Sequence, residues 1–210
     1  MRTVEEIAAQ ASVIPVLVVE DVGHAAPLAV ALQAGGLRVV ELTLRTPAAL
    51  AALVAMKAAA PDLVVGMGTV LDAAQAQAAV AAGADFLVSP GATPELLAQF
   101  RALNIAALPG VATVSEAMAA RAAGFRTLKF FPAEPAGGPA YVSAMAGPLP
   151  DLSFCPTGGI GRERAKDYLK LSNVVCVGGS WIATAGLLAA GDFAAITENA
   201  RYAQSLKSTA

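Results

Sequence analysis

The sequence contains little of what a metal centre, a disulfide framework or a redox motif would require. It has one histidine, His24, and two cysteines in 210 residues. Metal sites usually combine several histidine, cysteine or carboxylate ligands, so we expect no metal and place His24 at the start of a surface helix. Cys155 and Cys176 lie in apolar runs without a CxxC spacing, and we interpret them as small buried fillers.

Charge is also scarce. Charged residues make up 14% of the chain, hydrophobic residues 56%, and the formal net charge is -2. A nucleic-acid-binding domain would present a basic face, and a disordered chain would be polar and strongly charged. We therefore predict a folded protein without a nucleic-acid partner. A chain of this length suits one sizeable domain better than two.

The longest stretch without charge, residues 171–191, approaches the length of a membrane-spanning helix. Asn173, Gly178 and Gly179 interrupt it, so a strand, a glycine turn and a helix describe it better. Glu5 and Glu6 stand where a signal peptide would carry bases. We therefore expect a cytoplasmic protein without a membrane partner.

Short apolar runs rich in β-forming residues recur about 20 to 26 residues apart, the spacing expected when strands alternate with crossover helices. The eight runs are 14–19, 37–43, 63–65, 86–88, 105–108, 127–131, 153–155 and 174–177.

Alanine-rich segments between these runs carry helix boundary signals. Thr46 with Pro47 and Thr93 with Pro94 supply a cap and a first-turn proline, and Thr113 with Glu116 forms a capping box. Glycines end several of these segments. Two of the predicted helices span 48–57 and 96–103, and the glycines that end three others are Gly35, Gly83 and Gly124.

Eight strand–helix units with nearly continuous apolar strands predict an α/β protein, a single (β/α)8 TIM barrel over residues 1–210. The alternative is an open doubly wound sheet. That fold usually carries a GxGxxG turn after the first strand, and residues 19–23 contain nothing similar.

Polar residues at the carboxyl ends of barrel strands are the candidates for a site. Alternation places Glu41 on the inner face of its strand, away from Leu42 and Leu44. An unpaired carboxylate inside a barrel is costly, so either function or a structural ion pair with Arg45 or Lys129 must account for it.

Lys129 ends the sixth strand run, between Leu128 and two phenylalanines. The other four of the five lysines, Lys57, Lys166, Lys170 and Lys207, lie on predicted helices or in the tail. Attack on a carbonyl requires a neutral amine, which an apolar enclosure favours. Lys129 is therefore a candidate nucleophile, although a lysine at a strand end can also simply extend into solvent.

Two glycine pairs follow the last two strand runs, Gly158 with Gly159 and Gly178 with Gly179. Glycine allows backbone N–H groups to approach an anion closely, and the loops after strands seven and eight form the usual phosphate site of this fold. We therefore predict a phosphorylated ligand. Thr69, after the third strand, is a further candidate ligand contact.

Taken together, these motifs resemble the 2-keto-3-deoxy-6-phosphogluconate (KDPG) aldolases, a family that also has 4-hydroxy-2-oxoglutarate (KHG) aldolase activity. The resemblance covers nearly the whole chain. It rests on residues 40–46, 68–70, 89–91, 113–116, 129–134, 154–160 and 178–181.

The resemblance implies a class I, metal-independent lyase that uses no cofactor. Lys129 would form the Schiff base and Glu41 would act as general acid and base. Arg45 and Thr69 would hold the pyruvyl carboxylate of a phosphorylated keto-acid substrate. The resemblance also implies a homotrimer in the Entner–Doudoroff pathway. The remaining implied contacts are to phosphate by Gly158, Gly159, Gly179 and Ser180, and to the pocket lining by Phe131 and Thr157.

Three alternatives remain open from the sequence. The substrate could be the galactose-configured phosphorylated compound or unphosphorylated KHG, although Ser180 beside the second glycine pair favours the gluconate-derived one. A phosphosugar isomerase or epimerase would use the same glycine loops but does not explain Lys129. A non-enzymatic barrel would have lost at least one of Glu41, Arg45 and Lys129, and all three are present.

Overall fold

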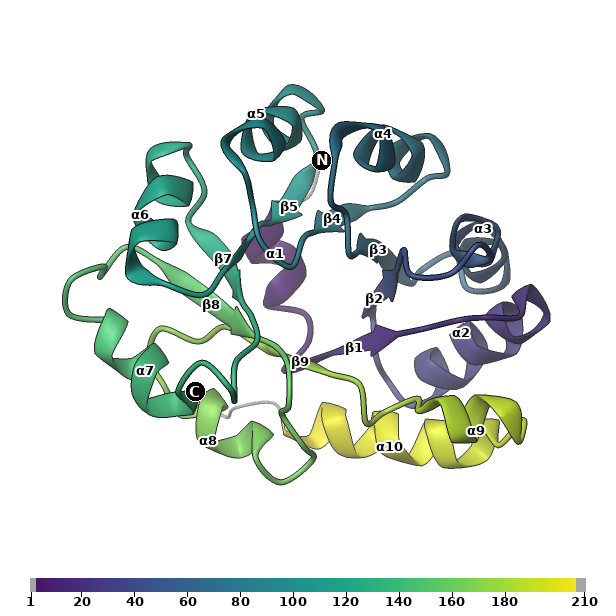
Figure 1. Cartoon of the computed structure of the whole chain (residues 1–210). Coiled ribbons are helices and arrows are strands. Elements are labelled where there is room, and N and C mark those ends of the chain that lie inside the picture. The colour runs from purple at the N-terminus through teal and green to yellow at the C-terminus, as the bar shows by residue number, and fades with distance from the viewer. Residues whose placement is uncertain (1–2, 207–210) are drawn as a thin grey trace.

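Parallel strands form the centre of the protein and helices surround them (Figure 1). The computed structural model describes residues 3–206, so Lys207 lies outside the described residues. The strands are β1 (Val13–Leu17), β2 (Val39–Thr43), β3 (Val64–Gly68), β4 (Phe86–Val88), β5 (Ala106–Leu108), β6 (Gly110–Val111), β7 (Thr127–Phe130), β8 (Ser153–Pro156) and β9 (Val177–Gly179).

Helices follow the strands along the chain, which confirms the predicted alternation of strand and helix. They are α1 (Val4–Ala8), the 3-10 turn η1 (Val22–His24), α2 (Ala25–Ala34), α3 (Ala49–Ala59), α4 (Ala73–Ala81), α5 (Pro94–Ala102), α6 (Val114–Ala122), α7 (Gly138–Met145), α8 (Ala165–Leu169), α9 (Ala185–Ala189) and α10 (Phe193–Ser205). Within residues 3–206, none of them is both long and apolar enough to cross a bilayer.

The strands divide into a six-stranded sheet, in the order β5-β4-β3-β2-β1-β9, and a three-stranded sheet, β6-β7-β8. The paired strands run parallel, as predicted. The predicted fifth run, 105–108, corresponds to β5. A further short strand, β6, follows after Pro109, which has no N–H to donate, and the Gly110 N–H bonds the Ser89 side-chain oxygen at 3.3 Å. Single bridges join Phe154 to Val174 and Thr157 to Gly178.

At two places the structure departs from the local signals in the sequence. Thr46 does not cap α3, because its hydroxyl donates to the Val19 carbonyl at 2.6 Å, and α3 begins at Ala49 after an uncapped Ala48. The eighth run was placed too early: Val174 makes a single bridge, and the strand begins at Val177. Gly178 and Gly179 therefore belong to strand β9 rather than to a turn.

The other capping predictions are confirmed. Thr93 accepts from the Leu96 N–H with Pro94 in the first turn of α5, and Thr113 with Glu116 forms a complete capping box at α6. Gly83 and Gly124 follow their helices with φ of 94° and 95°, a conformation that suits glycine. After α2, it is Gly36 rather than Gly35 that takes the positive φ.

Side-chain alternation along the strands separates two apolar cores. Val40 and Leu42 pack with the helices in the outer core, whereas Val39 belongs to an inner core between the strands. Glu41 lies on the same face as Val39 and is 4% exposed, so its predicted inward orientation is confirmed. The buried cysteines, Cys155 and Cys176, also belong to the inner core and are free, as predicted.

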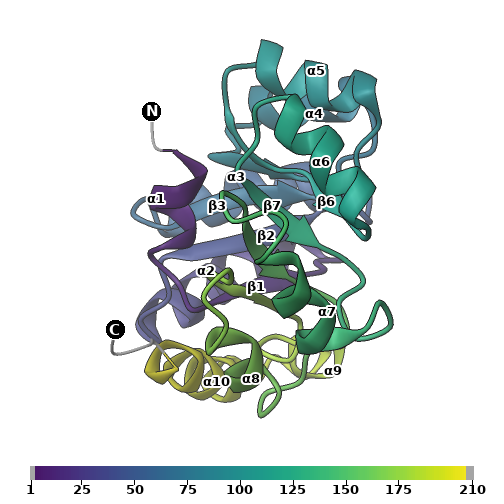
Figure 2. The same ribbon diagram turned by 90° about the vertical axis from the view of Figure 1, so that its left-hand side faces the viewer.

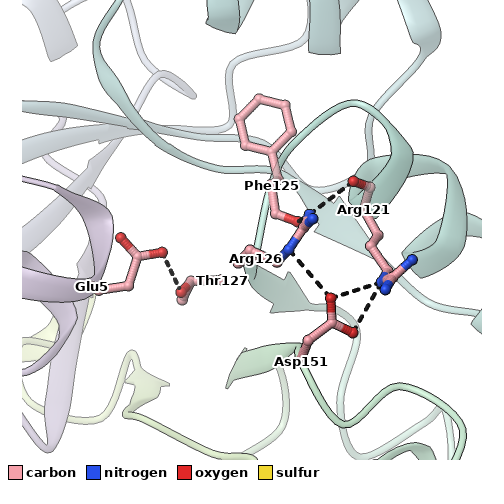
Figure 3. A network of polar contacts seen from close by, with 6 residues as sticks. All are labelled: Glu5, Arg121, Phe125, Arg126, Thr127 and Asp151. Atoms are coloured by element: carbon pink, nitrogen blue, oxygen red, sulfur yellow. Dashed lines mark hydrogen bonds and ion pairs between the residues drawn. The ribbon is translucent and has the colours of Figure 1, made fainter.

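Helix α1 covers the amino-terminal ends of the strands (Figure 2), where Ile7 and Ala8 enter the inner core. The Thr127 hydroxyl, at the start of β7, donates to the Glu5 carboxylate at 2.9 Å (Figure 3). Nearby, Asp151 accepts two hydrogen bonds from Arg121 at 2.8 and 2.9 Å, and this contact lowers the pKa of Asp151. Arg126 pairs with the same carboxylate at 3.3 Å, so the beginning of β7 is anchored on both sides.

Gly66 provides a test of inner-core packing. A Cβ at this position would lie 2.4 Å from the buried Phe86 ring, so Gly66→Ala should lower the free energy of unfolding by about 1–3 kcal/mol. The matched control is Gly147→Ala, where a Cβ would meet nothing within 4 Å. Urea unfolding measures both variants, and equal midpoints for the two would show that this core accommodates the extra methyl group.

Candidate active site

Lys129 and Glu41 form a buried ion pair between strands β7 and β2. Lys129 Nζ donates to Glu41 Oε1 at 2.9 Å, and the two residues are 3% and 4% exposed. Burying two charges costs more than their attraction usually returns, and apolar residues of similar volume often serve stability as well or better. The pair is therefore poorly explained as a stabilising device. Two chemically active groups are held in contact 88 positions apart in the chain.

Glycines on the neighbouring strand make room for the Glu41 side chain. A Cβ on Gly68 would lie 2.2 Å from Glu41 Oε1, so only glycine leaves the carboxylate in its place. Gly66 is the register partner of Glu41 on β3, and the Phe86 ring fills the space above it. The ring and the inner core give the carboxylate an apolar surrounding, in which its hydrogen bond to Lys129 is strengthened.

Arg45 and Thr69 meet at the carboxyl ends of β2 and β3. Arg45 Nε donates to Thr69 Oγ1 at 3.1 Å. Thr69 has φ of 60°, a left-handed conformation that is strongly unfavourable for a β-branched residue. Such backbone conformations cluster at functional sites, where the surrounding structure enforces them. Here the conformation points the Thr69 hydroxyl at the guanidinium, whose planar fork suits a carboxylate.

A cavity of about 110 Å³ opens above the ion pair. It brings Lys129 and Arg45 together with residues from the loop at 157–161, which we call the glycine loop. The cavity is lined by Val16, Arg45, Lys129, Phe131, Thr157, Gly158, Gly159, Ile160, Gly178 and Ser180. Lys129 Nζ also lies 5.4 Å from the centre of the Phe131 ring.

Most of the predicted site residues meet at this cavity. Of the ten, seven line it, and Glu41 and Thr69 contact lining residues, Lys129 and Arg45 respectively. Gly179 belongs to β9, where it pairs with Pro15 of β1, and does not line the cavity. Gly178 lines the cavity instead. A larger residue would not fit at 178, because a Cβ there would lie 2.3 Å from Thr157 Oγ1. Val16 and Ile160 were missed because apolar residues at strand ends look like core residues in sequence.

Other groups lie apart from this arrangement. A hollow of about 600 Å³ lies at the opposite ends of the strands, among Gln10, Arg38 and Asp85. The described residues that line it include no lysine, cysteine, serine or threonine, and none of them has a positive φ. Over residues 3–206, no three histidine, cysteine or acidic side chains gather closely enough to hold a metal ion. Lys57 and Lys166 lie in α3 and α8, and Lys170 follows α8, away from the cavity.

Comparison with known proteins shows that the chain is similar to enzymes. The family model described as KDPG and KHG aldolase matches residues 4–199. A 2-dehydro-3-deoxy-phosphogluconate aldolase from Pseudoalteromonas atlantica is 48% identical over 199 residues, which cover 95% of this chain and 93% of the relative.

Solved structures extend the similarity to the fold. KDPG aldolase from Legionella pneumophila, captured with pyruvate as a covalent carbinolamine intermediate, is 43% identical with a TM-score of 0.94, over 97% of this chain and 98% of that one. The aldolase of Zymomonas mobilis ZM4 with 3-phosphoglycerate is 45% identical with the same TM-score, 0.94, over 100% of this chain and 98% of that one.

The backbone at Thr69 yields a stability prediction. Thr69→Gly and Thr69→Ala both remove the hydroxyl that Arg45 contacts, but only glycine accepts φ of 60° without strain. The glycine variant should therefore be more stable than the alanine variant by about 1 kcal/mol, because the left-handed penalty exceeds the entropic cost of glycine. Chemical denaturation gives both values. An alanine variant of equal or greater stability would contradict the enforced conformation.

Proposed function

This chain belongs to the KDPG and KHG aldolase family, and from this premise we propose that it is a class I aldolase that cleaves KDPG to pyruvate and glyceraldehyde 3-phosphate. The observation that carries the proposal is the buried pair of Lys129 and Glu41, 2.9 Å apart beside the glycine loop. A lysine amine with an adjacent carboxylate is the combination that Schiff-base chemistry requires.

The first half of the reaction joins Lys129 to the substrate. Proton transfer from Lys129 to Glu41 frees the amine, whose nitrogen attacks the substrate C2 carbonyl and forms a carbinolamine. Glu41 returns the proton to the departing hydroxyl, water leaves, and a protonated imine remains. The hydrogen bond between the two side chains is already short enough for this exchange.

Carbon–carbon cleavage follows from the charge of the imine. Glu41, now a carboxylate, removes the proton from the C4 hydroxyl. The C3–C4 bond breaks, its electron pair forms the C2=C3 double bond of an enamine, and the π pair of the imine moves to nitrogen. Glyceraldehyde 3-phosphate leaves. Glu41 gives the proton it has taken to C3 of the enamine, which restores the imine, and water hydrolyses the imine to pyruvate and free Lys129. The imine is the electron sink, so the steps call for neither a metal nor a cofactor.

The lining of the cavity supports the assignment of substrate contacts. Arg45, oriented by Thr69, is suited to the pyruvyl carboxylate. We assign the phosphate to Gly158, Gly159 and Ser180, with Gly179 contributing as part of β9. Phe131 and Thr157 would line the space between these two anionic groups.

We further infer that the two sheets act as one closed (β/α)8 barrel in a single domain. Two features support this closure: β5 and β6 follow each other directly in the chain on one side, and on the other side Phe154 bridges to Val174 and Thr157 to Gly178. By family membership we also propose a cytoplasmic homotrimer that serves the Entner–Doudoroff pathway.

Rival activities differ in what they require of the site. The galactose-configured substrate would use the same imine and phosphate contacts, and KHG would leave the phosphate contacts unused. An isomerase or epimerase would use the glycine loop but would have no use for an amine nucleophile. The buried Lys129 therefore favours an aldolase.

Borohydride trapping tests the nucleophile. Reduction of the protein in the presence of pyruvate should leave a stable adduct on Lys129, located by peptide mass mapping, and Lys129→Met should abolish it. Lys57→Met is the matched control because Lys57 is also paired with a carboxylate, Asp85 at 2.6 Å, and should leave the adduct intact. An adduct on another lysine, or none, would overturn the role of Lys129 and favour the isomerase.

Comparison of three substrates tests the phosphate assignment. Pyruvate release should be faster from KDPG than from unphosphorylated KHG, because each good charge-assisted contact to phosphate contributes about 1.5–3 kcal/mol. The galactose-configured isomer, which carries the same phosphate, should also be cleaved faster than KHG. A coupled assay of pyruvate gives kcat/KM for each compound. Equal values for KDPG and KHG would disprove the assignment of phosphate to the glycine loop.

A further inference from the structure

Beside the glycine loop lies a polar cluster that the proposed reaction does not use. The Tyr168 hydroxyl donates to the Glu134 carboxylate at 2.5 Å, and Arg164 Nε contacts the same Oε1 atom at 3.4 Å. Tyr168 is 0% exposed, so its hydroxyl is buried with the ring. A phenylalanine would fill the same space without burying a polar group. Burial and the bond to Glu134 raise the pKa of Tyr168, so the hydroxyl remains a donor.

Glu134 is attached directly to the beginning of the glycine loop. The Ala133 N–H donates to the Thr157 carbonyl at 2.8 Å and the Glu134 N–H to the Gly158 carbonyl at 3.0 Å, which extends the β7–β8 pairing beyond both strands. At Gly159, which has φ of 79°, a Cβ would lie 2.9 Å from Glu134 Cβ. The backbone of Glu134 thus fixes where the two glycines lie.

The side chain of Glu134 is attached to the structure beyond the loop. Tyr168 belongs to α8, the helix that follows the loop, and Arg164 precedes that helix and also bonds Asp167 at 3.0 Å. The Ala165 N–H donates to the Gly161 carbonyl at 3.1 Å, which joins the end of the loop to α8. One residue, Glu134, therefore connects both ends of the glycine loop.

We propose that Glu134, Tyr168 and Arg164 are positioning residues that hold the glycine loop in the shape that receives the substrate phosphate, and so determine the preference for phosphorylated substrates. This inference rests on the proposed function for its substrate, but its geometry is independent of Lys129 and Glu41. The cluster lies on the loop side of the cavity and contains none of the groups assigned to imine chemistry. Its loss should weaken phosphate binding and leave carbon–carbon cleavage intact.

Tyr168→Phe removes the hydroxyl and keeps the buried ring. Glu134 has a side chain 30% exposed, so water can solvate its carboxylate and the fold should persist. The matched control is Tyr141→Phe. Tyr141 lies in α7 and stacks on Phe130 of β7. The Tyr141 hydroxyl makes no hydrogen bond within residues 3–206. Circular dichroism and unfolding midpoints of both variants check that the fold is unchanged.

Kinetics with two substrates separate positioning from a general structural role. For Tyr168→Phe we expect KM for KDPG to rise about tenfold with kcat unchanged, and KM for unphosphorylated KHG to stay at the wild-type value. Tyr141→Phe should change neither. An equal rise in KM for both substrates, or no rise for either, would overturn the positioning role.

Binding of 3-phosphoglycerate, measured by calorimetry, tests the cluster without turnover. Its Kd should rise about tenfold in Tyr168→Phe and remain unchanged in Tyr141→Phe. If the wild-type protein fails to cleave KDPG but this difference in Kd is found, the proposed function fails and the positioning role stands. If wild type cleaves KDPG and Tyr168→Phe binds 3-phosphoglycerate as wild type does, the positioning role fails and the aldolase stands.

Discussion

The rest of the site depends on one contact, the hydrogen-bonded pair of Lys129 and Glu41, which joins β7 of one sheet to β2 of the other. Two charged groups out of water are tolerable only when each is the partner of the other, and the surrounding chain serves to keep them aligned. Gly68 leaves space for the carboxylate, and the Phe86 ring covers Gly66 beside it. Thr127 and Arg126 anchor the beginning of β7, the strand that carries Lys129.

Much of the fold could be predicted from the sequence because local signals and tertiary structure agree. Regular spacing of apolar runs indicated parallel strands joined by helices, and the capping box at Thr113 marked a helix start that depends only on neighbouring residues. The predictions were wrong where contacts with residues distant in the sequence determine the local structure. Thr46 has a cap sequence, but its hydroxyl is taken by Val19 on another strand. Gly178 and Gly179 look like a turn, yet pairing with Ile14 and Pro15 makes them a strand.

The site was predictable where chemistry is unusual for its location. A carboxylate on an inward face and a lysine at a strand end are conspicuous, and the structure brings Glu41 and Lys129 together. Residues with ordinary side chains at special positions were not predictable: Val16 and Ile160 look like core residues, and the strained φ of Thr69 has no local sequence signal. The network of Tyr168 and Glu134 also escaped notice, because it joins residues 34 positions apart.

Helix α1 has a consequence for the order in which molecules can move. With Ile7 and Ala8 packed into the inner core at the amino-terminal ends of the strands, Lys129 is reached from the side of the glycine loop. In the proposed reaction the three-carbon fragment stays bonded to the lysine at the inner end, and the phosphorylated aldehyde lies between it and solvent. Product release is therefore ordered: the aldehyde has to leave the cavity before the water molecule that releases pyruvate can reach the imine by the same path.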